Sequence, residues 1–176
     1  MRVFSHLHIE QDCAIELVSQ YDEALGPDAR AGLGLDLCRI AGNIAQVRDE
    51  IVVPSLALTV LDRRLLDDAI IDMDLVSLVV NELYATRTTE FLYDGLVRSL
   101  GSLLERRFAL DEAPEGLWTA ASRTGADLLE IDLRIGRRLR ELDRFSRTAD
   151  WRPAPPAGFE TCRASVPPGA APRNAD

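Results

Sequence analysis

Apolar residues recur every three or four positions from Asp28 to Leu58, which places them on one face of a helix. We therefore predict a long amphipathic helix there, with Asp28 as its N-cap after the helix-breaking pair Gly26-Pro27. Pro54 lacks an amide hydrogen, so we expect it to kink the end of this helix without terminating it at once. The apolar stripe consists of Leu33, Leu37, Ile40, Ile44, Val47 and Ile51.

Three further stretches have the same period and predict helices over residues 5–25, 61–85 and 89–112. Asp62 is the expected N-cap of the second of these helices. Their apolar stripes are, in chain order, Ile9, Cys13, Leu17, Tyr21 and Ala24; Leu66, Ala69, Met73, Val76, Val80 and Leu83; and Tyr93, Leu96, Leu100, Leu103, Leu104 and Phe108.

No segment sustains the apolar–polar alternation of a strand, so the chain is predicted to be all-α. Four long helices with short connections predict an up-down-up-down four-helix bundle. An additional C-terminal helix is expected over residues 125–147, and the segment Leu117-Trp118 is expected to pack over the bundle end. Residues 1–147 then form one helical domain, and residues 148–176, rich in proline and alanine, form a tail that we expect to be disordered.

The chain has a formal net charge of −9, and all 20 of its basic residues are arginine. The acidic balance disfavours a role in binding nucleic acid or anionic membranes, because both require a basic surface. We attribute the absence of lysine to the coding bias of a GC-rich genome, and it excludes Schiff-base catalysis by a lysine.

The three cysteines, Cys13, Cys38 and Cys162, form no CxxC pair, so a reducing compartment fits better than a disulfide framework. No signal peptide is visible, and no apolar run reaches the length of a bilayer span. We therefore expect a cytoplasmic bacterial protein. The two histidines, His6 and His8, lie near the N-terminus and lend little support to Ser-His-Asp chemistry.

Each predicted long helix contains one segment that combines apolar positions with charged residues at a fixed spacing. The segments are Ile9-Glu10-Gln11-Asp12-Cys13; Ile44 to Leu56, which ends in Val52-Val53-Pro54-Ser55-Leu56; Ala69-Ile70-Ile71-Asp72-Met73; and Leu103-Leu104-Glu105-Arg106-Arg107 through Asp111-Glu112. In order and spacing, over residues 5–145, they resemble the hemerythrin-like (HHE cation-binding) family.

The resemblance implies a bundle in which histidines and carboxylates hold a di-iron centre. An acidic residue persists at the last ligand position, Asp111 or Glu112, but Arg48 stands at the position of a ligand carboxylate. Apolar and cationic side chains oppose metal binding, so we expect that the iron chemistry does not transfer and that no cofactor is bound. The ligand histidines of the family fall on Cys13, Ile44, Met73 and Arg107.

Ile44 and Met73 lie on apolar stripes, which indicates that hydrocarbon fills the position of the metal. Cys13 and Met73 could ligate copper(I), but two sulfur ligands without a third make a poor site, so core packing is expected. Arg48 is expected to face the same interior, where an unpaired guanidinium is very costly. We therefore hypothesise an ionic cluster at this position, with solvated surface pairs as the alternative. Its members are Asp12, Arg48, Arg107, Asp111 and Glu112.

The leading functional hypothesis is a hemerythrin-like domain that has lost di-iron binding and acts as a non-catalytic interaction or ligand-binding module. Its partner is an unknown protein or small molecule, and neither nucleic acid nor a membrane is expected. One alternative is an iron-dependent oxygen- or redox-linked protein of the same family that uses other ligands. Another is a small enzyme that uses the former metal cavity.

Overall fold

Helices and their connections make up residues 4–146, the part of the chain that the computed structural model describes, and no strand occurs among them. The predicted all-α class is confirmed. No helix in this part is long and apolar enough to cross a membrane. The predicted tail, residues 148–176, lies outside the described residues. The elements are α1 (Ser5–Glu23), α2 (Pro27–Val47), η1 (Arg48–Val52), α3 (Val53–Leu56), α4 (Arg63–Ala85), α5 (Phe91–Glu112), α6 (Leu117–Ser122) and α7 (Leu128–Ser146).

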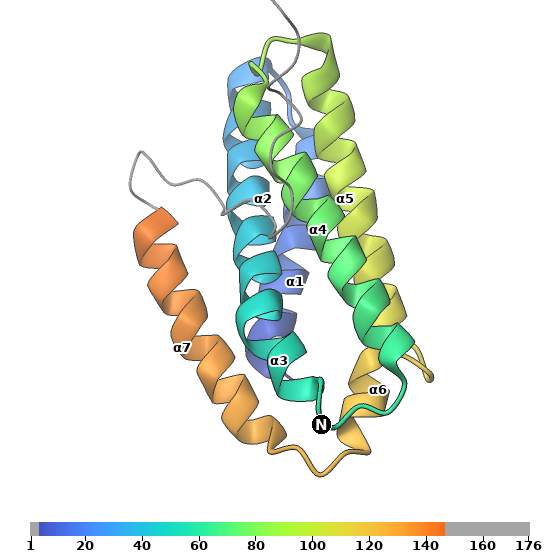
Figure 1. The fold of residues 1–176 in the computed structure, drawn as a ribbon. Helices are drawn as coiled ribbons and strands as arrows, with labels where there is room; N and C mark the ends of the chain where they lie inside the picture. The colour runs from blue at the N-terminus through green and yellow to red at the C-terminus, as the bar shows by residue number, and fades with distance from the viewer. Residues whose placement is uncertain (1–3, 147–176) are drawn as a thin grey trace, which may run out of the picture.

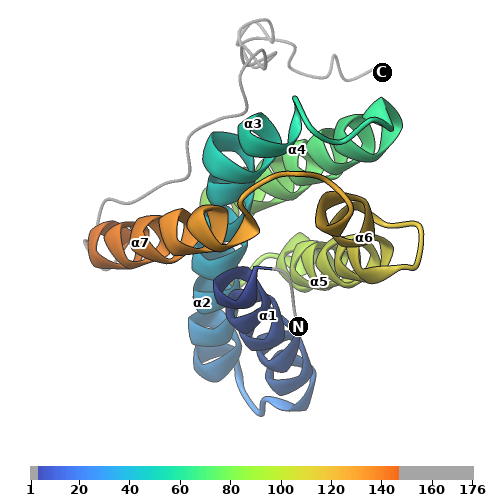
Figure 2. The same cartoon turned by 90° about the horizontal axis from the view of Figure 1, so that it is seen from below.

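The long helices α1, α2, α4 and α5 pack side by side around a common interior (Figures 1 and 2). α1 contacts α2 and α5, and α4 contacts the same two helices, so the four helices close a ring. Because the connections between consecutive long helices are short, neighbouring helices run in opposite directions (Figure 1). α7 lies outside this ring against α1, α2 and η1, and α6 packs against α5.

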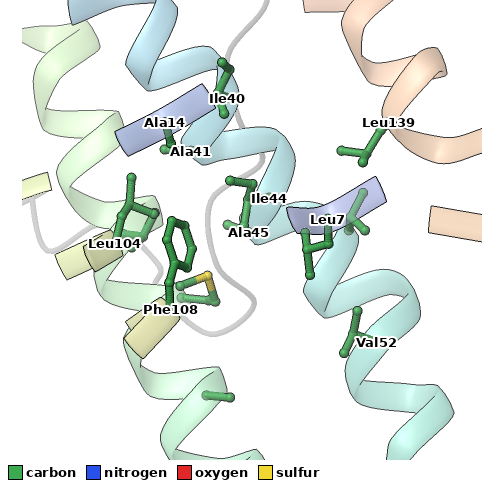
Figure 3. Packing of buried hydrophobic residues seen from close by; sticks show 14 of the residues in the cluster. Leu7, Ala14, Ile40, Ala41, Ile44, Ala45, Val52, Leu104, Phe108 and Leu139 are labelled. Carbon is green, nitrogen blue, oxygen red and sulfur yellow. The ribbon is translucent and has the colours of Figure 1, made fainter. Parts of the chain in front are cut away.

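The interior is built largely from the stripes predicted for α2, α4 and α5. Every predicted stripe residue of α4 is buried, and in α2 only Leu33 is partly exposed. Figure 3 shows Ile44 of α2 in the interior together with Leu104 and Phe108 of α5. The prediction that Ile44 and Met73 are core residues is confirmed, with exposed fractions of 0% and 5%.

The stripe predicted for α1 is wrong in the first half of the helix, whereas Leu17 packs against the core and Tyr21 is buried as predicted. Ile9 is 59% exposed and Cys13 is also exposed, so neither lies in the core. The buried face of α1 includes two polar residues, His8 and Gln11, and an apolar stripe cannot reveal a face of this composition. The residues of α1 that are buried are Leu7, His8, Gln11, Ala14 and Tyr21.

The long helix that begins at Pro27 continues through one π-helical turn, η1, and stays helical to Leu56. Within this turn the Val53 amide binds the carbonyl of Arg48, five residues earlier. Pro54 follows directly and has no amide hydrogen to give to the preceding turn. The prediction that Pro54 does not end the helix at once is therefore confirmed, and a π-helical turn precedes the proline.

The two predicted helix starts have different outcomes. Asp62 caps α4, because its side chain accepts a hydrogen bond from the Arg64 amide at 3.1 Å. Asp28 is not the N-cap of α2, because Pro27 already occupies the first turn. The cap residue is Gly26, whose φ of 103° is a backbone conformation that favours glycine.

Two ion pairs attach α7 to the helix that contains η1. Arg138 of α7 binds Glu50 of η1, with a distance of 2.7 Å between Nε and Oε2. Hydrogen bonds from Arg138 hold the pKa of the Glu50 carboxyl below its ordinary value. Asp143 of α7 binds Arg39 of α2 at 2.6 Å. These contacts are partly exposed, so they position α7 more than they stabilise the fold.

A substitution in α2 tests whether its glycine-rich start is helical in solution. Gly32 is exposed, and a Cβ there would meet no atom within 4 Å. We expect Gly32→Ala to raise the free energy of unfolding by about 0.5–1 kcal/mol, measured by urea denaturation, because alanine restricts the unfolded chain. The matched variant is Gly34→Ala, whose Cβ would lie 2.5 Å from the Tyr93 hydroxyl. It should destabilise, and a loss of stability in Gly32→Ala would contradict a helix at this position.

Candidate functional site

Two arginine side chains are buried among the helices. Arg48, at the junction of α2 and η1, is 1% exposed, and Arg107 of α5 is 2% exposed. A guanidinium carries its charge and five N–H donors wherever it lies. Burying it is costly unless acceptors surround it.

The acceptor common to both arginines is Asp111, which is 0% exposed. Arg48 donates from Nη2 to Oδ2 of Asp111. Arg107 donates from Nη2 to Oδ1 of Asp111 at 2.7 Å. Arg107 and Asp111 are one turn apart on α5, so their helix holds this pair in register. One carboxylate thus serves two buried cations, one from each of two helices.

A second carboxylate comes from α4. Asp72 is 6% exposed and accepts from Arg107 Nη1 at 3.2 Å. Its other oxygen accepts from Arg106 Nη2 at 3.1 Å, and the Arg106 side chain is 65% exposed. We call Arg48, Asp72, Arg107 and Asp111 the buried ion-pair network; its charges sum to zero.

Aromatic side chains cover the Arg48 side of the network. The Arg48 Cζ atom lies 5.0 Å from the centroid of the Trp118 ring, within the range of a cation–π contact. Phe4, at the N-cap of α1, packs edge-on against Trp118 at 5.0 Å between centroids. The network and its aromatic cover therefore link α1, η1, α4, α5 and α6.

The network leaves some donors unused. Within the described residues, Arg48 Nη1, Arg107 Nε and Trp118 Nε1 are buried without a hydrogen-bond partner. All three are donors, so any remaining binding capacity here is for an acceptor and not for a cation. Both carboxylates already bind guanidinium groups.

The structure brings together three of the five residues hypothesised for the ionic cluster: Arg48, Arg107 and Asp111. Asp12 instead lies on the exposed face of α1. Glu112 is also outside the network, because its exposed carboxylate lies 3.1 Å from His8 Nδ1. Asp12 was expected inside as the neighbour of Cys13, and Cys13 is exposed. Glu112 was the alternative to Asp111 at the last acidic position, and Asp111 is the one that is buried.

Sequence reasoning missed Asp72 and the contact of Trp118 with Arg48. The signal for Asp72 is present in the chain, because a carboxylate between Ala69 and Val76 falls within a buried apolar stripe of α4. A charged residue at such a position needs a buried partner of opposite sign. For Trp118, the sequence predicted packing against the other helices but not a contact with Arg48.

The side chains at the resemblance's ligand positions do not fit a di-iron centre. Ile44 and Met73 are apolar core residues, Cys13 is exposed, and Arg48 and Arg107 are ion-paired cations. Among residues 4–146, no group of three or more His, Cys, Asp or Glu side chains is placed to hold a metal ion. No reaction step through iron follows from this arrangement.

A serine, a histidine and an aspartate also meet where α1 begins, but not as a catalytic triad. Ser5 donates from Oγ to Asp132 at 2.6 Å, and the His6 amide donates to the same carboxylate at 3.1 Å. His6 Nδ1 also lies 3.2 Å from this carboxylate, and the Ser5 hydroxyl binds the carboxylate and not the imidazole, which is not the arrangement of a Ser-His-Asp triad. Asp132 of α7 instead anchors the first turn of α1.

The chain was compared with family models, with curated proteins and with solved structures, and none of them matches it. The likeness to hemerythrin-like proteins therefore depends on the order and spacing of the four sequence segments alone.

Proposed function

We propose that this chain is a hemerythrin-like up-down-up-down bundle whose metal centre has been replaced, and that it acts as a non-catalytic interaction or ligand-binding module. The observation that carries the proposal is the position of Asp111, which shares its two oxygens between Arg48 and Arg107 inside the bundle. By the resemblance, both arginines stand where the family has metal ligands. Guanidinium groups repel the cations that such ligands bind.

The chemistry of the network favours a structural role over catalysis. A catalytic acid or base needs an accessible group with free capacity to exchange protons. Asp72 and Asp111 are at most 6% exposed, and each accepts hydrogen bonds from two arginines. Such a network holds helices in one arrangement, which suits a rigid scaffold that presents binding surfaces.

Metal analysis of the purified protein tests the proposal. The protein is prepared under reducing conditions, incubated with Fe²⁺ without oxygen, desalted, and measured by mass spectrometry of metals and by absorption spectroscopy. We expect far less than one iron per chain and no ligand-to-metal band. Incubation before desalting is the control against loss of metal during purification. Stoichiometric iron with an optical band would overturn the proposal and favour the alternative, an iron-dependent protein that uses other ligands.

A further inference from the structure

We propose that an open pocket at one end of the bundle binds a small amphipathic anion, meaning a molecule with an apolar body and one acidic head group. This inference rests on the proposed function and deepens it, because it names a site and a ligand class for the binding module. The pocket lies between the α1–α2 turn and the first turns of α5. Its volume is about 820 Å³, and small-molecule sites commonly measure about 300–1,000 Å³.

Large apolar side chains surround the opening. Leu25 and Phe91 are each 96% exposed, and Leu92 is 65% exposed. Single exposed apolar residues are ordinary, but these three line the same opening, where a ligand could cover them together. This rim suits the apolar body of a ligand.

A fixed arginine supplies the polar side of the pocket. Arg30 donates from Nε to the Ala24 carbonyl at 3.2 Å and from Nη1 to Asp94 at 3.3 Å. Its Cζ atom lies 5.9 Å from the centroid of the Tyr21 ring. These contacts hold the guanidinium in place before a ligand arrives, which reduces the entropy lost on binding.

The acidic groups of the pocket already have partners. Asp94 accepts from Arg30 and, at 2.5 Å, from the Tyr21 hydroxyl. Burial and this hydrogen bond raise the pKa of Tyr21, so it stays a neutral donor. Glu90 accepts from the Arg87 amide at 3.3 Å. Arg98 adds a second cation to the wall, where it binds Asp22 at 3.3 Å.

The helix N-termini at the pocket favour a negatively charged ligand. Both α2 and α5 begin at the pocket, where Gly26, Pro27, Glu90 and Phe91 line it, and neither helix has a side-chain cap. Exposed amides at helix N-termini favour negative charge. The carboxyl end of α1 is also present, but Arg30 already binds its Ala24 carbonyl. Two arginines and two acidic residues line the pocket, so their formal charges cancel. The preference for an acidic head group therefore comes from the N–H donors of Arg30 and from these helix ends.

Two fluorescent probes of nearly the same shape test the charge preference. One is 8-anilinonaphthalene-1-sulfonate, and the other is its uncharged analogue N-phenyl-1-naphthylamine. We expect the sulfonate to bind the full chain about tenfold more tightly than the amine. Arg30→Gln should remove this preference by weakening the sulfonate alone, and Arg30→Lys should keep most of it.

A pair of matched double variants tests the location. Replacing Phe91 and Leu92 with serine should weaken both probes about tenfold, because the apolar rim is lost. Replacing Leu58 and Leu61 with serine is the control. These two leucines are 94% and 99% exposed in the connection between α3 and α4, outside the pocket. The control should leave both affinities unchanged, and circular dichroism checks that every variant is folded.

Three results would overturn the pocket proposal. The first is equal affinity of the wild type for the two probes, and the second is unchanged probe binding in a folded Phe91 and Leu92 double variant. The third is a change in the oligomeric state of this double variant without a change in its probe binding. The last result would assign the rim to contacts between copies of the chain. Iron content is measured separately, so a failed pocket with low iron rejects only this inference. Stoichiometric iron with the expected probe pattern rejects the metal-free function and leaves the pocket standing.

Discussion

Asp111→Ala is expected to lower the free energy of unfolding by about 3–5 kcal/mol, the range for removing one partner of a buried ion pair. Its carboxylate is 0% exposed and binds two guanidinium groups. Without it, Arg107 keeps Asp72, but among residues 4–146 the contact left to the Arg48 guanidinium is the ring of Trp118. A loss of this size is a large share of the total stability of a small domain, about 5–15 kcal/mol. Urea denaturation followed by circular dichroism measures it.

The matched variant Arg48→Met distinguishes the effect of losing the cation on stability from the effect of losing the carboxylate. Asp111 then keeps Arg107 but its Oδ2 atom loses its donor, so we expect a loss of about 1–3 kcal/mol, smaller than that of Asp111→Ala. Asp111→Ala lowers stability because it leaves Arg48 buried without an acceptor. The resulting loss in the free energy of unfolding should therefore be about 1–3 kcal/mol smaller in the Arg48→Met background. Asp68→Ala, at an exposed position of α4, controls for the loss of one negative charge.

Equal losses for Asp111→Ala and Arg48→Met, or strict additivity in the double variant, would contradict the shared-acceptor arrangement. A stable Arg48→Met protein with unchanged probe binding would in addition show that the buried charge has no part in binding. A loss of stability in Arg48→Met would not by itself assign a function to Arg48, because any buried charge affects stability.

The helices facing the interior with apolar stripes could be predicted from the sequence because burial and periodicity coincide there. In α4, every residue of the predicted stripe is buried, including Met73. In α1, His8 and Gln11 lie on the buried face, whereas Ile9 points outward into a groove against α7. Periodicity assigns faces by hydrophobicity, so it fails where a helix buries polar groups and also packs a second helix on its outer side.

Three residues of the site were predicted from the sequence: Arg107 and Asp111 of α5, and Arg48, which the spacing of the resemblance placed in the same interior. Arg107 and Asp111 are one turn apart on α5, so their pairing follows from helix geometry. The roles of Asp72 and Trp118 depend on how α4 and α6 dock against α5 and η1, and no local pattern encodes that geometry. The π turn at Arg48 is a further case, since Pro54 indicates a disturbance of the helix but not which residues it redirects.

Gly116→Ala is expected to lower the free energy of unfolding by about 3 kcal/mol, the upper end of the usual range for overpacking. The φ of Gly116 is −78°, which alanine adopts freely, so the loss comes from crowding and not from the backbone conformation. A Cβ at Gly116 would lie 2.2 Å from the Leu110 carbonyl oxygen and 2.5 Å from that of Asp111. These are backbone atoms of α5, which cannot move aside as a flexible side chain can.

Relief of this clash requires α6 to move away from α5, and α6 carries Trp118, which covers Arg48. Gly116→Ala and Asp111→Ala therefore disturb the same guanidinium, and their combined loss should be smaller than the sum of the two. Gly125→Ala is the matched control, because a Cβ there meets nothing within 4 Å. It should change stability by less than about 0.5 kcal/mol. An equally mild effect of Gly116→Ala would mean that α6 docks loosely and that Trp118 is not a fixed cover of the ion-pair network.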